Sequence, residues 1–526
     1  MKKIFSYIIA GCLSLSFSGC LDMESVSNIT DTKYWKDPAQ FNAFNVGLHG
    51  LLRERSYNIF LLGEARADIY GGTPFTGEAT RGYERLWQNS LSQISPVISN
   101  FGDFYKIINQ LNLMIDRTEA TEVLDKDTHA YYLAEAYGMR AYVYFHLLRT
   151  YGKCVLRLDP TEGTNIDLGN VSMKESSADV VMEQIKKDIK SSEDYFGEDY
   201  SFKFGKSFWS KAATLMLKGE VYLWSGKQMN GGEADYRTAK KALEDVSKSG
   251  VKLIDDFKKV FAYDNKENDE IIFTIHNGRD EYSMWNDQYR MSMVLNSQNF
   301  KILCDENGTL LESTELKDMN GLIVFPLNID LNKKLFRDGD KRKESTLKEI
   351  YKKNEETNAI EYQAPVAYKF QGVLLEGAST RSWLDDYPIY RYADCLLLLA
   401  TAKAFLNEDI TTEINAVRER AYGKEYFQQN ISTLGYPNDT DGGFYSGNKY
   451  VASDSEPIEA ILKERMREFV YEGKRWYDIR LMGNEYVTKY SSATEDKLLW
   501  PIDENSLGEN SALEQTPGYK MNNSDN

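Results

Sequence analysis

Hydrophobic positions recur at spacings of three and four residues through much of the first half of the chain. Small and aromatic residues share these positions in two stretches: Ala134, Gly138, Ala141, Phe145 and Leu148, and Phe208, Ala212, Leu215, Gly219 and Tyr222. This spacing predicts amphipathic helices. Because small residues let a second helix approach closely and receive a Tyr or Trp side chain, the pattern also predicts antiparallel helix pairs.

One helix pair is expected over 205–225 and 236–249, with a break at Ser225-Gly226 and a stop at Gly250. The pair resembles a tetratricopeptide unit, but no strict period of about 34 residues runs through the chain, so irregular repeats are expected. Further helices are predicted at 102–118, 176–195, 392–405 and 456–472, the last opened by Asp454 or Ser455 and by Pro457.

Helical periodicity fades between about 253 and 388, where 270–276 and 321–327 are predicted as short strands among long connections. We therefore predict a mostly α fold, in which irregular tetratricopeptide-like helix pairs form a scaffold over about 30–250 and 390–526. A loop-rich subdomain carrying short strands spans about 253–388. Binding residues concentrate in long irregular segments of this kind.

The N-terminus has the layout of a lipoprotein signal peptide. Two lysines precede an apolar run from 4 to 17, and Ser18 and Gly19 lead into Cys20. The run is shorter than the roughly 20 residues that span a bilayer core. The segment 1–19 is therefore expected to be removed, leaving one domain over 20–526 whose Cys20 carries the acyl chains that anchor it to a membrane.

The other cysteines offer less chemistry. Residues 9–12 fit the pattern before a lipidated cysteine better than Phe17 to Gly19 do, but Cys12 leaves too short an apolar run. Cys154, Cys304 and Cys395 have neither zinc nor redox spacing, and each is expected to be a small core residue.

Composition supports a large core and excludes one class of partner. Hydrophobic residues make up 42% of the chain and aromatic ones 13%, which argues against disorder. The net charge of -17 becomes about -19 once the two lysines leave with the signal peptide. No cluster of basic residues interrupts this charge, so nucleic acid is not an expected partner.

Sequence motifs give no support for catalysis. None of the four histidines has a second one at metal-ligand spacing, and no nucleophile elbow, Walker loop or dinucleotide fingerprint is present. No enzyme activity and no cofactor are therefore expected. With 80 acidic residues, a carboxylate pair suited to glycoside hydrolysis stays open, because that mechanism needs a separation in space rather than a sequence signature.

Two clusters combine aromatic rings with amides or charges: Arg81, Tyr83, Trp87, Gln88 and Asn89, and Tyr282, Trp285, Asn286, Gln288 and Tyr289. Sugars bind through such sets, since a pyranose face packs on a ring while its hydroxyls need planar polar partners. Core packing is the alternative for any single ring. The charged run 337–343 is interpreted as a solvated face, and the residues around Asp439 and Asp441 as a surface turn.

Several segments resemble the signatures of the SusD/RagB family. Near the C-terminus these are RYADCLLLLATAKAFLN (391–407), INAVRERAYG (414–423), ERMREFVYEGKRWYDIRLMG (464–483) and LLWPIDENSLGENSALEQTPGY (498–519). Upstream, 34–52, 134–152 and 212–226 fit the same family in order and spacing. Thr401 and Asp503 depart from the usual residues. The carboxylates of Glu464, Glu468 and Glu472 are expected to form ion pairs with Arg465, Arg467, Arg475 and Arg480 that lock the scaffold.

The resemblance implies a glycan-binding lipoprotein on the outer face of an outer membrane. It would capture an oligosaccharide or polysaccharide and cap a SusC-like TonB-dependent transporter for uptake. Residue type and locality suggest a ligand set of Asp68, Arg81, Trp87 and Asn89 from the N-terminal part, with Tyr282, Trp285 and Tyr289 from the irregular middle. The alternative is a helical-repeat scaffold that binds a peptide or protein.

Overall fold

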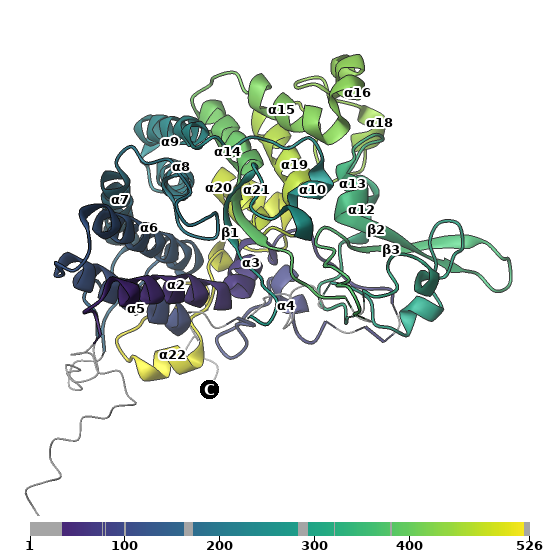
Figure 1. Cartoon of the computed structure of the whole chain (residues 1–526). Coiled ribbons are helices and arrows are strands. Elements are labelled where there is room, and N and C mark those ends of the chain that lie inside the picture. The colour runs from purple at the N-terminus through teal and green to yellow at the C-terminus, as the bar shows by residue number, and fades with distance from the viewer. Residues whose placement is uncertain are drawn as a thin grey trace, which may run out of the picture.

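The computed structural model describes residues 34–75, 77–78, 80–98, 101–161, 172–281, 293–319, 321–378 and 381–519. These residues are mostly helical, as the hydrophobic spacing predicts (Figure 1). The long helices are α2 (Pro38–Glu54), α5 (Phe101–Glu119), α6 (Lys126–Tyr151), α7 (Ala178–Phe196), α8 (Lys211–Gln228), α9 (Gly232–Val246), α14 (Tyr392–Phe405), α15 (Thr411–Tyr422) and α19 (Pro457–Phe469).

Shorter helices connect and cover these. They are α3 (Ser56–Glu64), α4 (Glu84–Trp87), α10 (Phe257–Val260), α12 (Ile329–Lys333), α13 (Arg342–Thr346), α16 (Lys424–Gln429), α17 (Ile431–Leu434), α18 (Gly442–Tyr445), α20 (Arg475–Met482), α21 (Asn484–Tyr490) and α22 (Glu504–Glu509). Short 3-10 turns occupy Ser247–Ser249, Tyr263–Asn265, Asn299–Lys301, Leu311–Ser313 and Glu495–Lys497.

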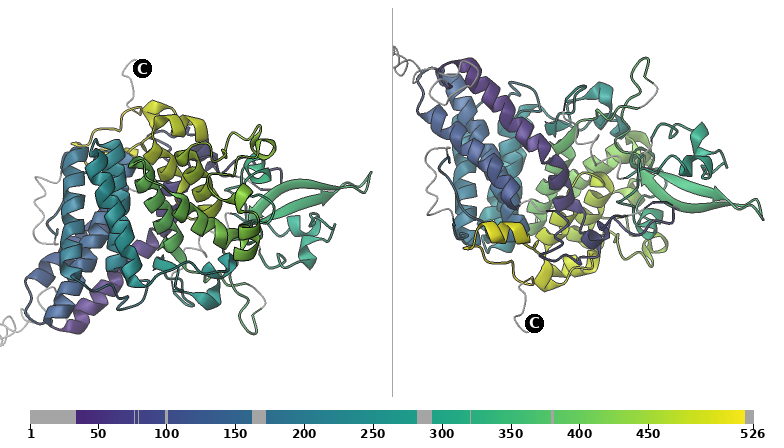
Figure 2. Two further views of the ribbon diagram at one scale, coloured as in Figure 1. Left: turned by 90° about the horizontal axis from the view of Figure 1, so that it is seen from above. Right: turned by 90° about the horizontal axis from the view of Figure 1, so that it is seen from below.

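The long helices form one continuous stack. Helix α2 packs on α5, and each helix from α5 to α9 packs on the next. Helix α9 then packs on α14, and α14 packs on α15 and α19, so the two helical segments predicted from the sequence meet in space. Figure 2 shows this stack beside the more irregular middle of the chain. The prediction of a scaffold of irregular helix pairs is confirmed.

Glycines on the helix faces allow the close approach. A side-chain carbon on Gly138 would lie 2.1 Å from Nε1 of Trp209, and one on Gly226 would lie 2.5 Å from the ring of Tyr236. Gly219 receives Leu243 in the same way. Aromatic and aliphatic side chains thus fill the gaps that small residues leave, which is the packing predicted for these helices.

The described residues contain four strands, three of which were not predicted from the sequence. Strand β1 (Ile271–Ile275) confirms the prediction at 270–276 and pairs with β4 (Tyr387–Arg391), which joins the two ends of the middle segment. Strands β2 (Leu347–Lys353) and β3 (Ile360–Ala367) form a hairpin that extends from the body in Figure 1. The boundaries of the loop-rich subdomain stay a prediction.

The strand predicted at 321–327 is wrong. The segment makes only an isolated bridge, between Leu327 and Tyr70, and its other backbone hydrogen bonds are single ones to loops. The run of consecutive apolar residues at 323–325 is buried without forming a ladder of strand pairs.

The carboxylates near α19 form ion pairs, but mostly with other partners than predicted. Glu464 contacts Arg342 and Arg418, Glu468 contacts Arg342, Arg391 and Arg420, and Glu472 contacts Arg391 and Lys369. All of these side chains are buried. Only Arg467 of the predicted arginines approaches one of the three glutamates, 4.0 Å from Glu464.

The charged run 337–343 is only partly a solvated face. Asp340 and Arg342 are buried and paired at 2.7 Å, and Arg337 pairs with the buried Asp439. Asp439 therefore does not belong to a surface turn. Cys154, Cys304 and Cys395 are free and buried, as predicted. Across the described part of the chain, no helix is long and apolar enough to cross a membrane.

Candidate functional site

The loop that carries the first predicted ligand cluster, residues 71–98, follows the end of α3 and is held there by Asn89. The Asn89 amide donates to the carbonyl oxygen of Arg66 at 3.1 Å and to the hydroxyl of Ser492 at 3.1 Å. Its own oxygen accepts from Nε of Arg66 at 2.7 Å. Asn89 is only 7% exposed, and its side-chain amide is occupied by these hydrogen bonds, which hold the loop against Arg66 and Ser492.

Asp68 is also engaged within the chain. Its two carboxylate oxygens accept from Nε and Nη2 of Arg475, at 3.0 and 3.1 Å, in a bidentate pair that is buried on both sides. A ligand would have to break this pair to reach the carboxylate. Asp68 and Asn89 therefore position the candidate site in this structure, and direct ligand contact by either stays a prediction.

Arg81 and Trp87 are the accessible members of the predicted N-terminal set. Arg81 is exposed, and Trp87 is half-buried at the end of α4. Trp87 lies with Tyr70, Tyr83 and Phe325 in an aromatic cluster, where ring centroids are 4.8 to 6.4 Å apart. Tyr70 and Phe325 form the buried side of this cluster, and Tyr83 and Trp87 form the side open to solvent. We call it the Trp87 cluster.

The Glu78 carboxylate joins the Trp87 loop to residues 296–323 of the middle segment. Glu78 accepts from the backbone N–H of Asn296 at 2.8 Å and from the amide of Asn299 at 3.0 Å. Its second oxygen accepts from the N–H of Ile323 at 2.7 Å. Residues that follow the segment 282–292 therefore contact the loop of Trp87. Tyr282, Trp285 and Tyr289 themselves lie outside the described residues.

Sequence reasoning did not identify Glu78 or Phe325. Glu78 has no sequence signal, because its partners lie more than two hundred positions away. Phe325 belongs to the segment predicted as a strand, and its contact with Tyr83 depends on the bridge between Leu327 and Tyr70. In the same loop Thr80 donates to Glu84 at 2.6 Å, a hydrogen bond that lowers the pKa of the Glu84 carboxyl.

The loop is conformationally strained. Ten non-glycine residues of the described chain have a positive φ, and Arg81, Asn89 and Val97 account for three of them, at 53°, 52° and 65°. Such conformations cost free energy and persist where surrounding contacts fix them, often at binding sites. Here the hydrogen bonds of Asn89 supply that fixation, and one of them, to the carbonyl oxygen of Trp87 at 3.4 Å, helps to hold Trp87 in place before any ligand arrives.

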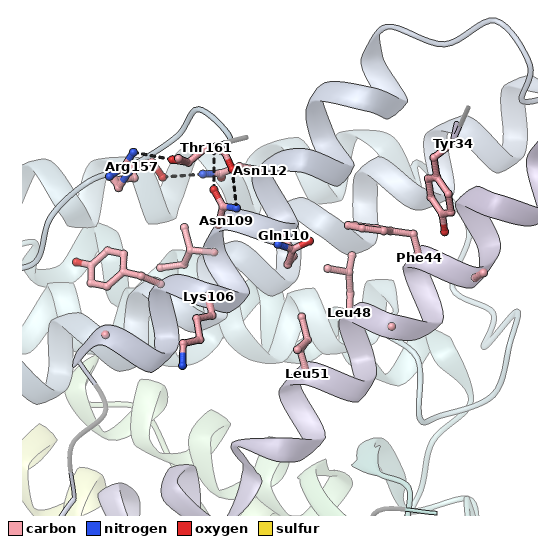
Figure 3. A pocket seen from close by; sticks show the side chains of 15 residues that line it. Tyr34, Phe44, Leu48, Leu51, Lys106, Asn109, Gln110, Asn112, Arg157 and Thr161 are labelled. Atoms are coloured by element: carbon pink, nitrogen blue, oxygen red, sulfur yellow. Dashed lines mark hydrogen bonds between the residues drawn. The ribbon is translucent and has the colours of Figure 1, made fainter. Parts of the chain in front are cut away.

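A separate hollow of about 780 Å³ lies between α2 and α5 (Figure 3). Phe44, Leu48 and Leu51 form its apolar wall on α2. On the other side, Asn109 exchanges two hydrogen bonds with the backbone of Thr161, at 2.7 and 3.3 Å. Neither Arg81 nor Trp87 lines this hollow. Among the residues that the structure describes, no group of His, Cys, Asp or Glu side chains is placed to hold a metal ion.

Comparison with known proteins establishes the family. The profile described as "SusD family" matches residues 269–484, and the profile described as "Starch-binding associating with outer membrane" matches 36–223. NanU of B. fragilis is 57% identical, with a TM-score of 0.91 over 95% of this chain and 100% of that one. The chain belongs to the SusD/RagB family.

Two further relatives cover nearly the whole chain. A SusD superfamily protein of Bacteroides vulgatus is 56% identical, with a TM-score of 0.89 over 92% of this chain and 100% of that one. The SusD-like protein P38 of Formosa agariphila is 24% identical over 96% of both chains. The similarity therefore extends from the first helices to the C-terminal segments, in agreement with the order of motifs in the sequence.

Proposed function

We propose that this protein is a glycan-binding lipoprotein of the outer membrane, which captures oligosaccharides and passes them to a TonB-dependent transporter without cleaving them. The observation that carries this proposal is the Trp87 cluster, an aromatic surface on the loop that also carries the exposed Arg81. A ring packs on the apolar face of a pyranose, and a guanidinium donates to its hydroxyls. A laminarin-binding SusD-like protein shares the fold, and the matched profile names starch binding at the outer membrane.

The membrane anchor fits the geometry of the chain. Residues 21–33 separate Cys20 from Tyr34, and about 13 residues reach at most roughly 45 Å when extended. Lipidation of Cys20 would therefore keep the N-terminal end of the helix stack within ~45 Å of the bilayer. Labelling with a radioactive fatty acid tests this step, and Cys20→Ala should abolish incorporation whereas Cys12→Ala should not.

Glycan binding is tested by calorimetric titration of the full-length protein with starch-derived and laminarin-derived oligosaccharides. The detergent must lack a sugar headgroup, since alkyl glycosides would compete. Trp87→Ala and Trp285→Ala should each weaken binding about tenfold or more, as loss of an aromatic anchor does. Tyr195→Ala, which removes an exposed ring elsewhere, is the matched control and should bind as the wild type does.

Two results would contradict the proposal. Failure of every glycan to bind would remove the capture step, and steady release of new reducing ends from a bound glycan would identify an enzyme. Unfolding of the Trp87 variant, measured by circular dichroism, would make its loss of binding uninformative, and Trp87→Phe then serves as the milder change.

A second candidate function, binding of a peptide or protein segment, is favoured by the apolar hollow between α2 and α5. Its wall of Phe44, Leu48 and Leu51 would accept the apolar side chains of a partner. Titration with apolar peptides separates the two functions. If the hollow is the site, Leu51→Asp should abolish peptide binding and leave glycan binding unchanged.

A further inference from the structure

A second, polar hollow lies in a different part of the molecule. It has a volume of about 770 Å³ and is lined by residues 336–344, which lead into α13, and by residues 422–429, which include α16. Its size falls within the range of ordinary ligand sites. It shares no residue with the Trp87 cluster, and α16 lies near the top of the view in Figure 1, well above α4. We call it the Tyr426 hollow.

Tyr426 forms an aromatic wall of this hollow. Its side chain is 43% exposed, although it is large and mostly apolar. One part of the ring lies directly on Gly339, where a side-chain carbon would come within 2.8 to 3.1 Å of Cε1, Cζ and Oη. Gly339 has a φ of 84°, so both its backbone conformation and the ring contact require glycine. Tyr422 lies nearly parallel to Tyr426, with centroids 6.2 Å apart.

These contacts fix the ring rather than leave it free to rotate into solvent. A ring held in place, with nearly half its surface open, is prepared to pack against a flat apolar face. Burial in the core does not account for the exposed part of Tyr426. In this respect Tyr426 resembles Trp87 of the proposed binding loop.

The polar groups around the ring carry both signs of charge. In the described part of the chain, five charged residues line the hollow and form no ion pair: Asp338, Lys341, Glu344, Lys424 and Glu425. When the ion-paired Arg337, Asp340 and Lys343 are included, the lining has four carboxylates and four cationic groups, so the hollow offers donors and acceptors without an excess charge. A neutral ligand with many hydroxyls suits this set, whereas an anion or a cation would meet as much repulsion as attraction.

The floor of the hollow is rigid because buried ion pairs hold it. Nε and Nη2 of Arg342 donate to the two oxygens of Asp340, at 2.9 and 2.7 Å, and Nη1 of Arg342 lies 2.8 Å from Glu464 of α19. Arg337, at the edge, pairs with Asp439. The segment that supplies Asp338 and Lys341 is therefore anchored to the helical core, which lowers the conformational entropy lost on binding.

We infer that the Tyr426 hollow is a second sugar-binding site, which takes a short neutral oligosaccharide with one pyranose packed on the Tyr426 ring. Asp338, Glu344 and Gln429 supply acceptors and donors for its hydroxyls, and Lys341 and Lys424 donate from the rim. The ligand class follows from the proposed function, but the site is separate from the Trp87 cluster. Two sites on one chain would let a long glycan be held at two points, which raises its overall affinity.

The test uses hydrogen–deuterium exchange on the full-length protein, with maltohexaose and laminarihexaose as the probes. At saturating glycan, backbone amides of 336–346 and 422–434 should become protected. Tyr426→Ala should remove this protection and weaken binding at this site about tenfold, because it deletes the aromatic anchor. Tyr426→Phe should retain both, and Tyr195→Ala should have no effect.

The outcomes separate this inference from the proposed function. Protection confined to 71–98, with unchanged exchange at 336–346 and 422–434, overturns the second site and leaves glycan binding at the Trp87 cluster intact. Protection of the Tyr426 peptides that persists in Trp87→Ala supports two independent sites. If neither hexasaccharide binds or protects any amide, both the proposed function and the second site are overturned. If Tyr426→Ala leaves the protection of 336–346 and 422–434 unchanged, only the second site is overturned.

Discussion

Asp68 and Arg475 form a buried bidentate ion pair that joins the segment after α3 to the first residue of α20, across 407 positions of the sequence. Arg475 also donates to the carbonyl oxygen of Leu462 and lies 4.8 Å from the ring centroid of Tyr490. The pair thus fixes the start of the Trp87 loop against the C-terminal helices. A residue chosen from the sequence for its ligand chemistry serves here to support the loop.

Replacing Asp68 should cost stability rather than affinity. Asp68→Asn leaves the charge of Arg475 buried without its carboxylate, which destabilises proteins by about 3–5 kcal/mol. Urea unfolding should show this loss, and the remaining folded protein should bind glycan with nearly the wild-type affinity. Arg81→Ala is the matched opposite, since its exposed side chain should change stability by less than ~0.5 kcal/mol while weakening binding. Equal stability of Asp68→Asn and wild type would show that the pair contributes nothing.

Protonation of Glu464 and Glu468 should destabilise the protein in acid. Although burial raises the pKa of Glu464, the guanidinium groups of Arg342 and Arg418 lower it to about 2, and Arg420 and Arg391 likewise hold the pKa of the buried Glu468 far below its usual range. Stabilisation by these groups is complete above pH 4.5, their unfolded value, and is lost as the pH falls toward the folded values.

Glu468→Gln isolates this effect. The substitution leaves three arginines without a shared carboxylate, so unfolding in urea at pH 7 should require about 3–5 kcal/mol less free energy. The difference between variant and wild type should shrink below pH 4.5, because only the wild type loses a titrating group there. A difference that stays constant down to pH 3 would show that Glu468 does not carry the acid sensitivity.

The helices could be predicted from the sequence because their signals are local. The helix expected at 392–405 matches α14, and those expected at 102–118 and 176–195 differ from α5 and α7 by one or two residues at each end. The hairpin of β2 and β3 could not be predicted, since β2 carries charged residues and buries only Leu347 and Ile350. The apolar partners of Leu347 and Ile350 come from β3, where Ala364, Val366 and Ala367 are buried.

The candidate site was predictable only in part. Arg81 and Trp87 lie in a poorly periodic segment, which favoured a surface site over core packing, and in the structure Arg81 is exposed and Trp87 is half-buried. The burial of Asp68 and Asn89 depends on Arg475 and Arg66, and nothing in the local sequence connects them. The Tyr426 hollow was missed for the same reason, since Gly339 and Tyr426 meet only after folding.

His49 should make the protein lose stability in mild acid. Burial lowers the pKa of His49 from 6.5 to about 4. The backbone N–H of Trp209 donates to Nε2 of His49 at 3.1 Å, which requires the neutral imidazole ring. Stability is therefore complete above pH 6.5 and falls as the pH drops toward 4, by roughly 3 kcal/mol for this group. His49→Gln should flatten the change in urea midpoint between pH 7 and 5. If both proteins show the same slope, another group such as His146, whose pKa burial also lowers, dominates this range.

Replacing each of two helical glycines, Gly138 and Gly50, with alanine should change the stability of the protein in opposite directions. In Gly138→Ala the new methyl group would lie 2.1 Å from Nε1 of Trp209, which is fully buried and donates to Thr214 at 2.8 Å. The Trp209 ring must move, so the substitution should destabilise the protein by at least ~2 kcal/mol. Gly50→Ala in α2 meets no atom within 4 Å and should stabilise the protein by about 0.5–1 kcal/mol through helix propensity. Thermal unfolding of both variants measures the contrast, and a Gly138→Ala protein as stable as Gly50→Ala would show that the Trp209 contact is not close packing.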